Sequence, residues 1–214
     1  GPSGCGKSTL LSLLASLMEP ESGTIILRGK PLAPHTANIG YMLQKDHLLE
    51  WRTIYKNVLL GLEIRRELTA EKLAYVNQLL SDYGLDKFRS AHPSELSGGM
   101  RQRAAFLRTL LCHADILLLD EPFGALDVIT RGEMQDWLLG VRNKMNRTVL
   151  LVTHDMDEAI YLSDRILILD RKSGKVRREL CITEKNRSRD WLYQQGDLRR
   201  EIYQEIMGER NAKG

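Results

Sequence analysis

The first nine residues constrain the fold of this chain more than any other segment. They read G-P-S-G-C-G-K-S-T, which has the G-x-x-x-x-G-K-S spacing of a phosphate-binding loop. In such a loop the glycines let successive backbone N–H groups turn toward a polyphosphate, and a helix begins beneath it. The apolar pattern of residues 10–18 predicts that helix. The predicted phosphate contacts are Gly1, Pro2, Ser3, Gly4, Cys5, Gly6, Lys7, Ser8 and Thr9.

Two side chains of this loop have separate tasks. Lys7 can reach the β- and γ-phosphates as a point charge, and the Ser8 hydroxyl can hold Mg²⁺. The alternative is a glycine-rich turn that only joins two elements, which the Lys-Ser pair followed by a helix disfavours. A strand must deliver the loop, so we expect further sequence before Gly1.

Composition limits the class of protein. The chain has 214 residues, 43% apolar and 28% charged, which is typical of a globular protein with one core. No apolar run approaches the roughly 20 residues of a membrane span, so membrane association would come through a partner. Residues 171–214 carry 12 Lys and Arg against 7 Asp and Glu. This basic tail permits a nucleic-acid or membrane contact, although a solvated charged face is the commoner explanation. Three scattered cysteines form neither a disulfide framework nor a zinc site and fit a reducing cytosol.

Apolar runs and helical patterns alternate along the second half of the chain. The runs 116–119, 149–152 and 166–169 lack polar alternation, which predicts strands buried on both faces of a largely parallel sheet. Helical patterns at 130–145 and 156–162 lie between them, so the fold class is α/β, with ligands at the carboxyl ends of the strands. The remaining patterns predict strands at 24–27 and 39–43, a helical insertion at about 57–88 that ends near Gly84, an edge strand at 176–182 and a final helix at 191–207.

Two acids, Asp120 and Glu121, follow the strand 116–119. In a phosphate-loop protein such a strand lies beside the loop, so Asp120 can hold Mg²⁺ and Glu121 can orient and deprotonate the attacking water. The alternative is two solvated acids at a strand end, which the phosphate loop makes less favourable.

A second glycine pair precedes a helix predicted at about 100–112. The sequence L-S-G-G-M-R-Q-R at 96–103 aims the Ser97 hydroxyl and the amides of Gly98 and Gly99 in one direction, which makes a second anion site. One nucleotide cannot easily use two such sites in one subunit. Two subunits arranged head to tail can each close the other's nucleotide.

Together these features resemble the ATP-binding cassette (ABC) family along essentially the whole chain. Residues 96–102 are similar to its signature motif, Gln44 to its Q-loop glutamine, A-L-D at 125–127 to its D-loop and His154 to its switch histidine, in the family's order. The resemblance implies a RecA-like P-loop core at 1–45 and 113–214 and a helical subdomain at about 46–112. It also implies an adenine-stacking aromatic residue upstream of the phosphate loop.

The resemblance implies a role for each matched residue. Gln44 would sense Mg²⁺ and the attacking water, and His154 would hydrogen-bond the γ-phosphate and steady Glu121. A homodimer would hold two ATP molecules, with metal ligands Ser8, Gln44 and Asp120. The contacts in trans would come from Ser97, Gly98, Gly99, Gln102 and Asp127. The alternatives are an exposed loop glutamine for Gln44, a structural histidine for His154 and a helix cap for Asp127.

Residues 1–11, 121–127 and 151–159 most resemble the ATPases of nitrate, sulfonate and taurine importers, as does L-L-E-W at 48–51. This implies an ATPase on the cytoplasmic face of the membrane that powers uptake of a small solute. Its partners would be an integral-membrane permease, reached through residues 44–51, and indirectly a solute-binding protein, with no nucleic acid. The alternative is an ABC-type ATPase that acts on nucleic acid or the ribosome. Such proteins usually carry a long coiled-coil insertion, for which the about 50 residues after Gln44 leave no room.

Overall fold

The computed structural model describes residues 5–32, 38–112, 114–144, 147–170 and 173–211. The predicted phosphate contacts Gly1, Pro2, Ser3 and Gly4 lie outside the described residues. The chain divides into two units: unit 1 comprises Gly1–Leu11 and Leu151–Gly214, and unit 2 comprises Ser12–Leu150. Within the described residues, no helix is long and apolar enough to cross a membrane. The predicted division into a core and a helical subdomain stays a prediction.

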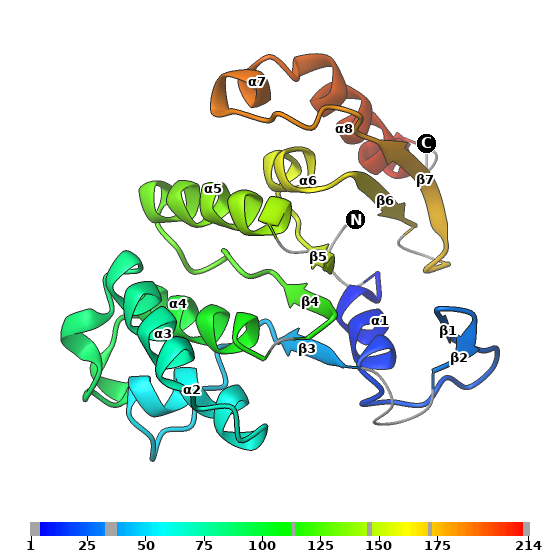
Figure 1. Ribbon diagram of the computed structural model, residues 1–214. Helices are drawn as coiled ribbons and strands as arrows, with labels where there is room; N and C mark the ends of the chain where they lie inside the picture. Colours follow the sequence, from blue (N-terminus) through cyan, green and yellow to red (C-terminus); the bar gives the residue numbers. More distant parts are fainter. Residues whose placement is uncertain (1–4, 33–37, 113, 145–146, 171–172, 212–214) are drawn as a thin grey trace. The chain divides into compact units, whose positions relative to one another are not determined.

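A parallel sheet forms the centre of unit 2 (Figure 1). Strand β3 (Ile39–Met42) pairs in parallel with β4 (Ile116–Asp120), with Ile39 opposite Ile116, and β5 (Thr148–Val152) follows β4 in the sheet order. The last four residues of β4 are buried, as the absence of polar alternation predicts. All three strands begin and end within one residue of their predicted bounds.

Three helices of unit 2 lie together beside this sheet in Figure 1: α2 (Ile54–Ile64), α3 (Ala70–Asp82) and α4 (Gly98–Leu110). The 3-10 turns η1 (Asp86–Phe88) and η2 (Pro93–Glu95) join α3 to α4. Threonine and serine side chains cap the three helices and set their first residues, so α2 begins three residues before the predicted start. The helical pattern predicted at about 57–88 is confirmed by α2 and α3, and Gly84, at φ +64°, ends α3 as predicted.

Close packing joins α4 to both of its neighbours in unit 2. A Cβ atom at Gly40 of β3 would stand 3.0 Å from Leu117 and 3.3 Å from the Thr109 carbonyl oxygen, so any larger residue would force its neighbours to shift. A side chain at Gly61 of α2 would likewise stand 3.0 Å from the Cys112 Sγ. Helix α4 and the residues that follow it are therefore packed closely against β3 and α2.

Aromatic side chains connect α4 to α5 (Val128–Lys144). The Trp137 ring meets the Tyr83 ring edge-on at 4.9 Å between centroids and the Phe106 ring at 5.6 Å. Burial raises the pKa of Tyr83 far above its usual value, and its hydroxyl has no hydrogen-bond partner among the residues that the structure describes. The Tyr83 ring therefore serves as a neutral, apolar contact.

The small hairpin of β1 (Ile26–Leu27) and β2 (Lys30–Pro31) replaces the predicted strand 24–27. Arg28 and Gly29 have φ values of +52° and +78°, which reverse the chain within two residues. The strand is two residues shorter than predicted at its start, since only Ile26 and Leu27 pair with Pro31 and Lys30.

Unit 1 contains β6 (Arg165–Leu169), β7 (Val176–Cys181), α6 (Met156–Leu162), α7 (Arg189–Tyr193) and α8 (Gly196–Asn211). Helix α6 and the edge strand are confirmed. The assignment of residues 166–169 to the largely parallel sheet is wrong, since β6 pairs antiparallel with β7. Strand β6 buries only one face, that of Ile166 and Ile168, whereas Leu167 is exposed.

The single final helix predicted at 191–207 is also wrong. The chain forms two helices because side chains take the last carbonyl groups of α7. The Gln195 side chain donates to the Trp191 carbonyl at 3.0 Å, and Arg199 donates to the Leu192 carbonyl at 2.7 Å. Helix α8 then restarts at Gly196. Apolar periodicity continues across such a break, so the pattern alone did not reveal it.

Candidate functional site

The described part of the phosphate loop leads directly into α1 (Lys7–Leu14). Gly6 has φ +90°, a conformation that side-chain-bearing residues rarely adopt, and its carbonyl accepts the first helical hydrogen bond, from Leu10 at 2.9 Å. Cys5 is buried, and Lys7 donates to its Sγ at 3.9 Å. Ser8 and Thr9 are exposed in the first turn of the helix. This end of α1 can therefore present amide and hydroxyl donors to an anion.

The predicted switch residue His154 lies exposed in unit 1 between β5 and α6. Thr153 accepts a hydrogen bond from the Asp155 amide at 2.9 Å and donates to the Glu158 carboxylate at 2.6 Å. Asp155 caps α6 by accepting from the Asp157 amide at 2.8 Å. These bonds hold the backbone on both sides of His154. Glu158 is only 4% exposed, and nothing in the sequence distinguishes it from any other helical acid.

Asp120, the last residue of β4, is 3% exposed, as expected for a carboxylate at the end of a buried strand. Burial raises the pKa of the neighbouring Tyr41, the Asp120 charge adds to the rise, and a hydrogen bond with Ser12 opposes it. Tyr41 therefore stays neutral beside the carboxylate. Ser12 follows Ser8 by four residues, on the same face of α1.

The structure brings Glu121 and Gln44 together. The Gln44 Nε2 atom donates to the Glu121 Oε2 atom at 3.3 Å. The carboxyl ends of parallel neighbours meet at one edge of a sheet, so the residues that follow β3 and β4 become neighbours. Glu121 has φ +49°, an uncommon conformation for a residue other than glycine. Its carboxylate is thus set by a strained turn together with a side-chain contact.

A buried glutamine spans this turn. Gln102 of α4, which is 6% exposed, donates from Nε2 to the Glu121 carbonyl at 3.1 Å. Its Oε1 accepts from the Ala125 amide at 2.8 Å. The Glu121 carbonyl also accepts from the Gly124 amide at 3.2 Å. Both polar ends of Gln102 are therefore engaged within the chain.

The glycine pair lies at the start of α4, which begins two residues earlier than predicted. Ser97 is the exposed N-cap, and its hydroxyl accepts from the Met100 amide at 3.3 Å. A side chain at Gly99 would meet nothing closer than 3.5 Å, and one at Gly98 nothing closer than 4.0 Å. Packing inside this chain therefore does not require glycine at either position.

The segment after Gln44 is bound to α4 by two arginines that the sequence analysis did not single out. Arg101 donates to the Asp46 carboxylate at 3.0 Å and to the Leu96 carbonyl at 2.9 Å. Arg108 donates to the carbonyls of Asp46 and His47, each at 2.8 Å. The loop that carries Gln44 and the helix that begins at Ser97 thus form one hydrogen-bonded body.

Asp127 begins α5. Its Oδ1 accepts from the Thr130 amide at 3.0 Å, and hydrogen bonds from Thr130 lower the pKa of the Asp127 carboxyl. This is the helix cap that the sequence analysis kept as an alternative. A contact of Asp127 with a second subunit stays a prediction.

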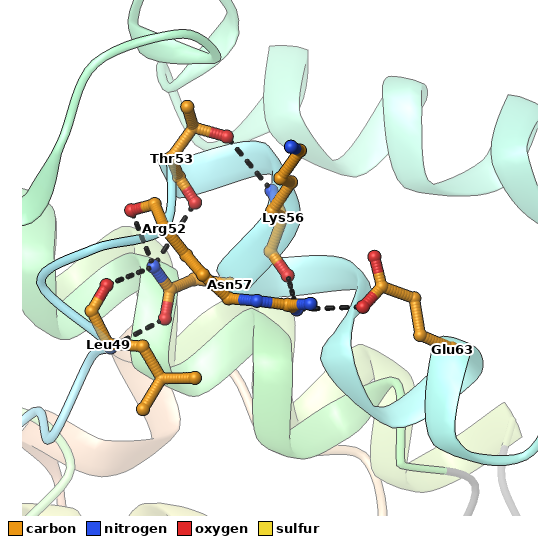
Figure 2. A network of polar contacts seen from close by, with 6 residues as sticks. All are labelled: Leu49, Arg52, Thr53, Lys56, Asn57 and Glu63. Carbon is orange, nitrogen blue, oxygen red and sulfur yellow. Dashed lines mark hydrogen bonds and ion pairs between the residues drawn. The ribbon is translucent and has the colours of Figure 1, made fainter.

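Asn57 organises the loop at residues 48–53, as Figure 2 shows. It is fully buried, and its Oδ1 accepts from the Leu49 amide at 2.7 Å. Its Nδ2 donates to the carbonyls of Leu49, Arg52 and Thr53 at 3.0–3.1 Å. Arg52 adds a 2.7 Å ion pair with Glu63 (Figure 2). The loop is thereby fixed, while the Trp51 side chain is 76% exposed.

The sequence of this chain is similar to that of known ATP-binding proteins. A family model described as ABC transporter matches residues 1–124. The nitrate import ATP-binding protein NrtD of Synechocystis sp. is 40% identical over 195 residues, which cover 88% of this chain and 73% of that protein. The taurine import ATP-binding protein TauB of Rhizobium johnstonii is 43% identical over 176 residues, 82% of this chain and 67% of that protein. The aliphatic sulfonates import ATP-binding protein SsuB of Bacillus cereus is also 43% identical over 176 residues, which cover 82% of this chain and 69% of that protein.

The fold comparison agrees with the sequence comparison. The dimeric structure of the ATP-binding cassette MJ0796, in a post-hydrolysis state bound to ADP and Pi, superposes with a TM-score of 0.74. The identity is 29%, and the match covers 86% of this chain and 84% of that chain. The predicted α/β P-loop fold and the resemblance to importer ATPases are both confirmed. This chain therefore belongs to the ABC transporter family and is an ATP-binding protein, an ATPase, of that family.

Proposed function

We propose that this chain hydrolyses ATP to power the uptake of a small nitrate-, sulfonate- or taurine-like solute through a separate permease. Three of the relatives, NrtD, TauB and SsuB, are named as import ATP-binding proteins, which supports uptake as the direction. The observation that carries hydrolysis is the contact between Glu121 and Gln44, which holds a carboxylate beside an amide donor at the end of β4.

The proposed chemistry assigns one task to each residue. Lys7 and the amides of the phosphate loop bind the β- and γ-phosphates. Glu121 accepts the proton of the attacking water. Gln44, whose amide lies next to the Glu121 carboxylate, orients that water. His154 donates to the γ-phosphate, and the bonds of Thr153 and Asp155 keep its loop in place. Loss of the γ-phosphate contacts after hydrolysis then lets the subunits separate.

The residues proposed for Mg²⁺ fit that ion. Ser8, Asp120 and Gln44 offer hydroxyl, carboxylate and carboxamide oxygens, and Mg²⁺ prefers oxygen donors. The described residues contain no group of three or more His, Cys, Asp or Glu that could hold a metal ion. Mg²⁺ usually needs only one or two carboxylates together with substrate phosphates and water. When bound, it supplies positive charge against the phosphates.

A second copy of the chain completes each ATP site in this proposal. Ser97 and Gly98 are exposed at a helix N-terminus, where amides favour negative charge. Since packing within the chain does not require glycine at positions 98 and 99, close approach of an outside phosphate is a fitting reason for the pair. The dimeric state of the MJ0796 cassette supports the same arrangement.

Mixed dimers test the arrangement in trans. Lys7→Ala and Ser97→Arg should each abolish hydrolysis as homodimers, because each damages both sites. An equal mixture should recover about a quarter of the parent turnover, because half the dimers are mixed and each contains one intact site. The measurement is phosphate release by the mixture against the two separate variants. If the sites were completed in cis, no mixture would recover activity.

The permease partner is proposed to contact the loop at residues 48–53, from the cytoplasmic side of the membrane. Trp51 is exposed on a loop held by the Asn57 bonds, and rigid exposed aromatic residues are common anchors of interfaces. With the permease in vesicles, ATP turnover should rise when the solute-loaded binding protein is added. Stimulation by DNA or RNA instead, lost at high salt, would contradict transport and favour the alternative function.

A further inference from the structure

We infer that Gln102 is a positioning residue for Glu121 inside its own subunit. This inference rests on the proposed function, in which Glu121 is the base. The resemblance groups Gln102 with the residues that contact nucleotide in trans. Its side chain, however, is 6% exposed, and both ends of its amide bond the turn that carries the base.

The geometry of this turn explains why it needs such support. Glu121 adopts φ +49°, which is unfavourable for a residue with a Cβ. Such conformations persist only where the surroundings over-determine them. Gln102 supplies two constraints that the turn cannot supply alone: a donor to the Glu121 carbonyl at 3.1 Å and an acceptor for the Ala125 amide at 2.8 Å. Together they fix both ends of the segment 121–125.

Gln102 also connects this turn to the helix that begins at Ser97. Gln102 lies on α4, five residues after the N-cap. The preceding residue of the same helix, Arg101, pairs with Asp46, two residues after Gln44. The Glu121 carboxylate is held by Gln44 and its backbone by Gln102. Helix α4 therefore supports the position of the proposed base both through Gln102 and through the loop that carries Gln44. A displacement of the base by about 1 Å can lower the catalytic rate by up to about 100-fold.

Kinetic analysis of Gln102→Met in the full chain tests the inference. Methionine has a similar length and no amide, so it removes both bonds while it keeps the volume. We expect kcat to fall about 10- to 100-fold with KM for ATP within about threefold. The matched control is Gln135→Met, the same change at a glutamine of α5 that is also 6% exposed. Its kcat should stay close to the parent value, and comparison of the two thermal midpoints separates folding from positioning.

Gln102→Glu distinguishes positioning from packing. The new carboxylate can still accept from the Ala125 amide, but when ionised it cannot donate to the Glu121 carbonyl. Protonation restores a donor, so the ratio of its kcat to that of the parent should rise as pH falls. A ratio that does not change with pH would overturn the inference. This variant also decides the question if Gln102→Met fails to fold.

A double variant separates failure of this inference from failure of the proposed function. In the Glu121→Gln background, Gln102→Met should cause little further loss, because the group that it positions is already absent. If Glu121→Gln alone keeps its turnover, the proposed base is wrong, and the inference falls with it. If Glu121→Gln is inactive but Gln102→Met turns over at the parent rate, only the inference is wrong.

Discussion

Glu121→Gln is expected to bind ATP with an affinity within a few-fold of the parent and to lose turnover by a factor of about 10² to 10⁴. The change removes the proton acceptor and little else. Glutamine has the same length, and the backbone bonds from Gln102 and Gly124 to the residue-121 carbonyl do not involve the carboxylate. The positive φ is imposed by the turn and is expected to persist.

Single-turnover and steady-state phosphate release measure the effect, together with equilibrium ATP binding. Glu133→Gln, the same substitution at an exposed position of α5, serves as the control and should retain parent turnover. The variant should also accumulate as an ATP-bound dimer, since loss of the γ-phosphate is what lets the subunits part in the proposed mechanism. Steady-state turnover within a few-fold of the parent would show that another group activates the water.

Asn57→Leu is expected to lower the free energy of unfolding by about 3 kcal/mol. The substitution leaves the Leu49 amide and the Arg52 carbonyl without the side-chain partner that Figure 2 shows, whereas the Thr53 carbonyl keeps its bond from the residue-57 amide. Buried backbone groups that lose their partners cost far more than exposed ones. Urea denaturation measures the loss, with Asn186→Leu as the control, because Asn186 is exposed.

Asn57→Asp adds a pH dependence whose sign follows from the same contacts. An ionised carboxylate at this position would face three carbonyl oxygens in a buried site, so its pKa in the folded state should rise above that in the unfolded chain. The variant should therefore be most stable at low pH and lose stability as pH rises through the raised pKa. A variant whose stability relative to the parent does not fall between acidic and neutral pH would contradict this account of the loop.

Much of the fold follows from local patterns in the sequence. The strands β3, β4 and β5 are unbroken apolar runs, and such runs have few alternatives to a buried parallel sheet. Caps and glycines likewise determine where α2, α3 and α4 begin and end. The break between α7 and α8 could not be predicted from the sequence pattern, because it depends on hydrogen bonds from the Gln195 and Arg199 side chains to carbonyls of α7. The antiparallel pairing of β6 with β7 could not be predicted either, since an apolar run does not specify which strand it pairs with or in which direction.

The candidate site shows the same division. The sequence singles out Lys7, Asp120, Glu121 and His154 because phosphate, metal and proton chemistry each need a particular residue type at a particular place in the motif order, and their roles stay predictions. The supporting contacts could not be predicted, even for Gln102 of the signature motif, because the position of a side chain in a helix does not tell which groups it will face after folding. Gln102, Arg101 and Glu158 acquire their roles from the groups that they face.

By itself, the sequence determined the family, the phosphate loop and the order of the chemical groups, because these are properties of spacing along one chain. Tertiary structure alone decided that Gln44 and Gln102 hold Glu121 from two sides, and that Asn57 fixes the loop that carries Trp51. The physical reason is that hydrogen bonds between residues far apart in sequence exist only after folding, when burial excludes water and makes each unmatched polar group costly.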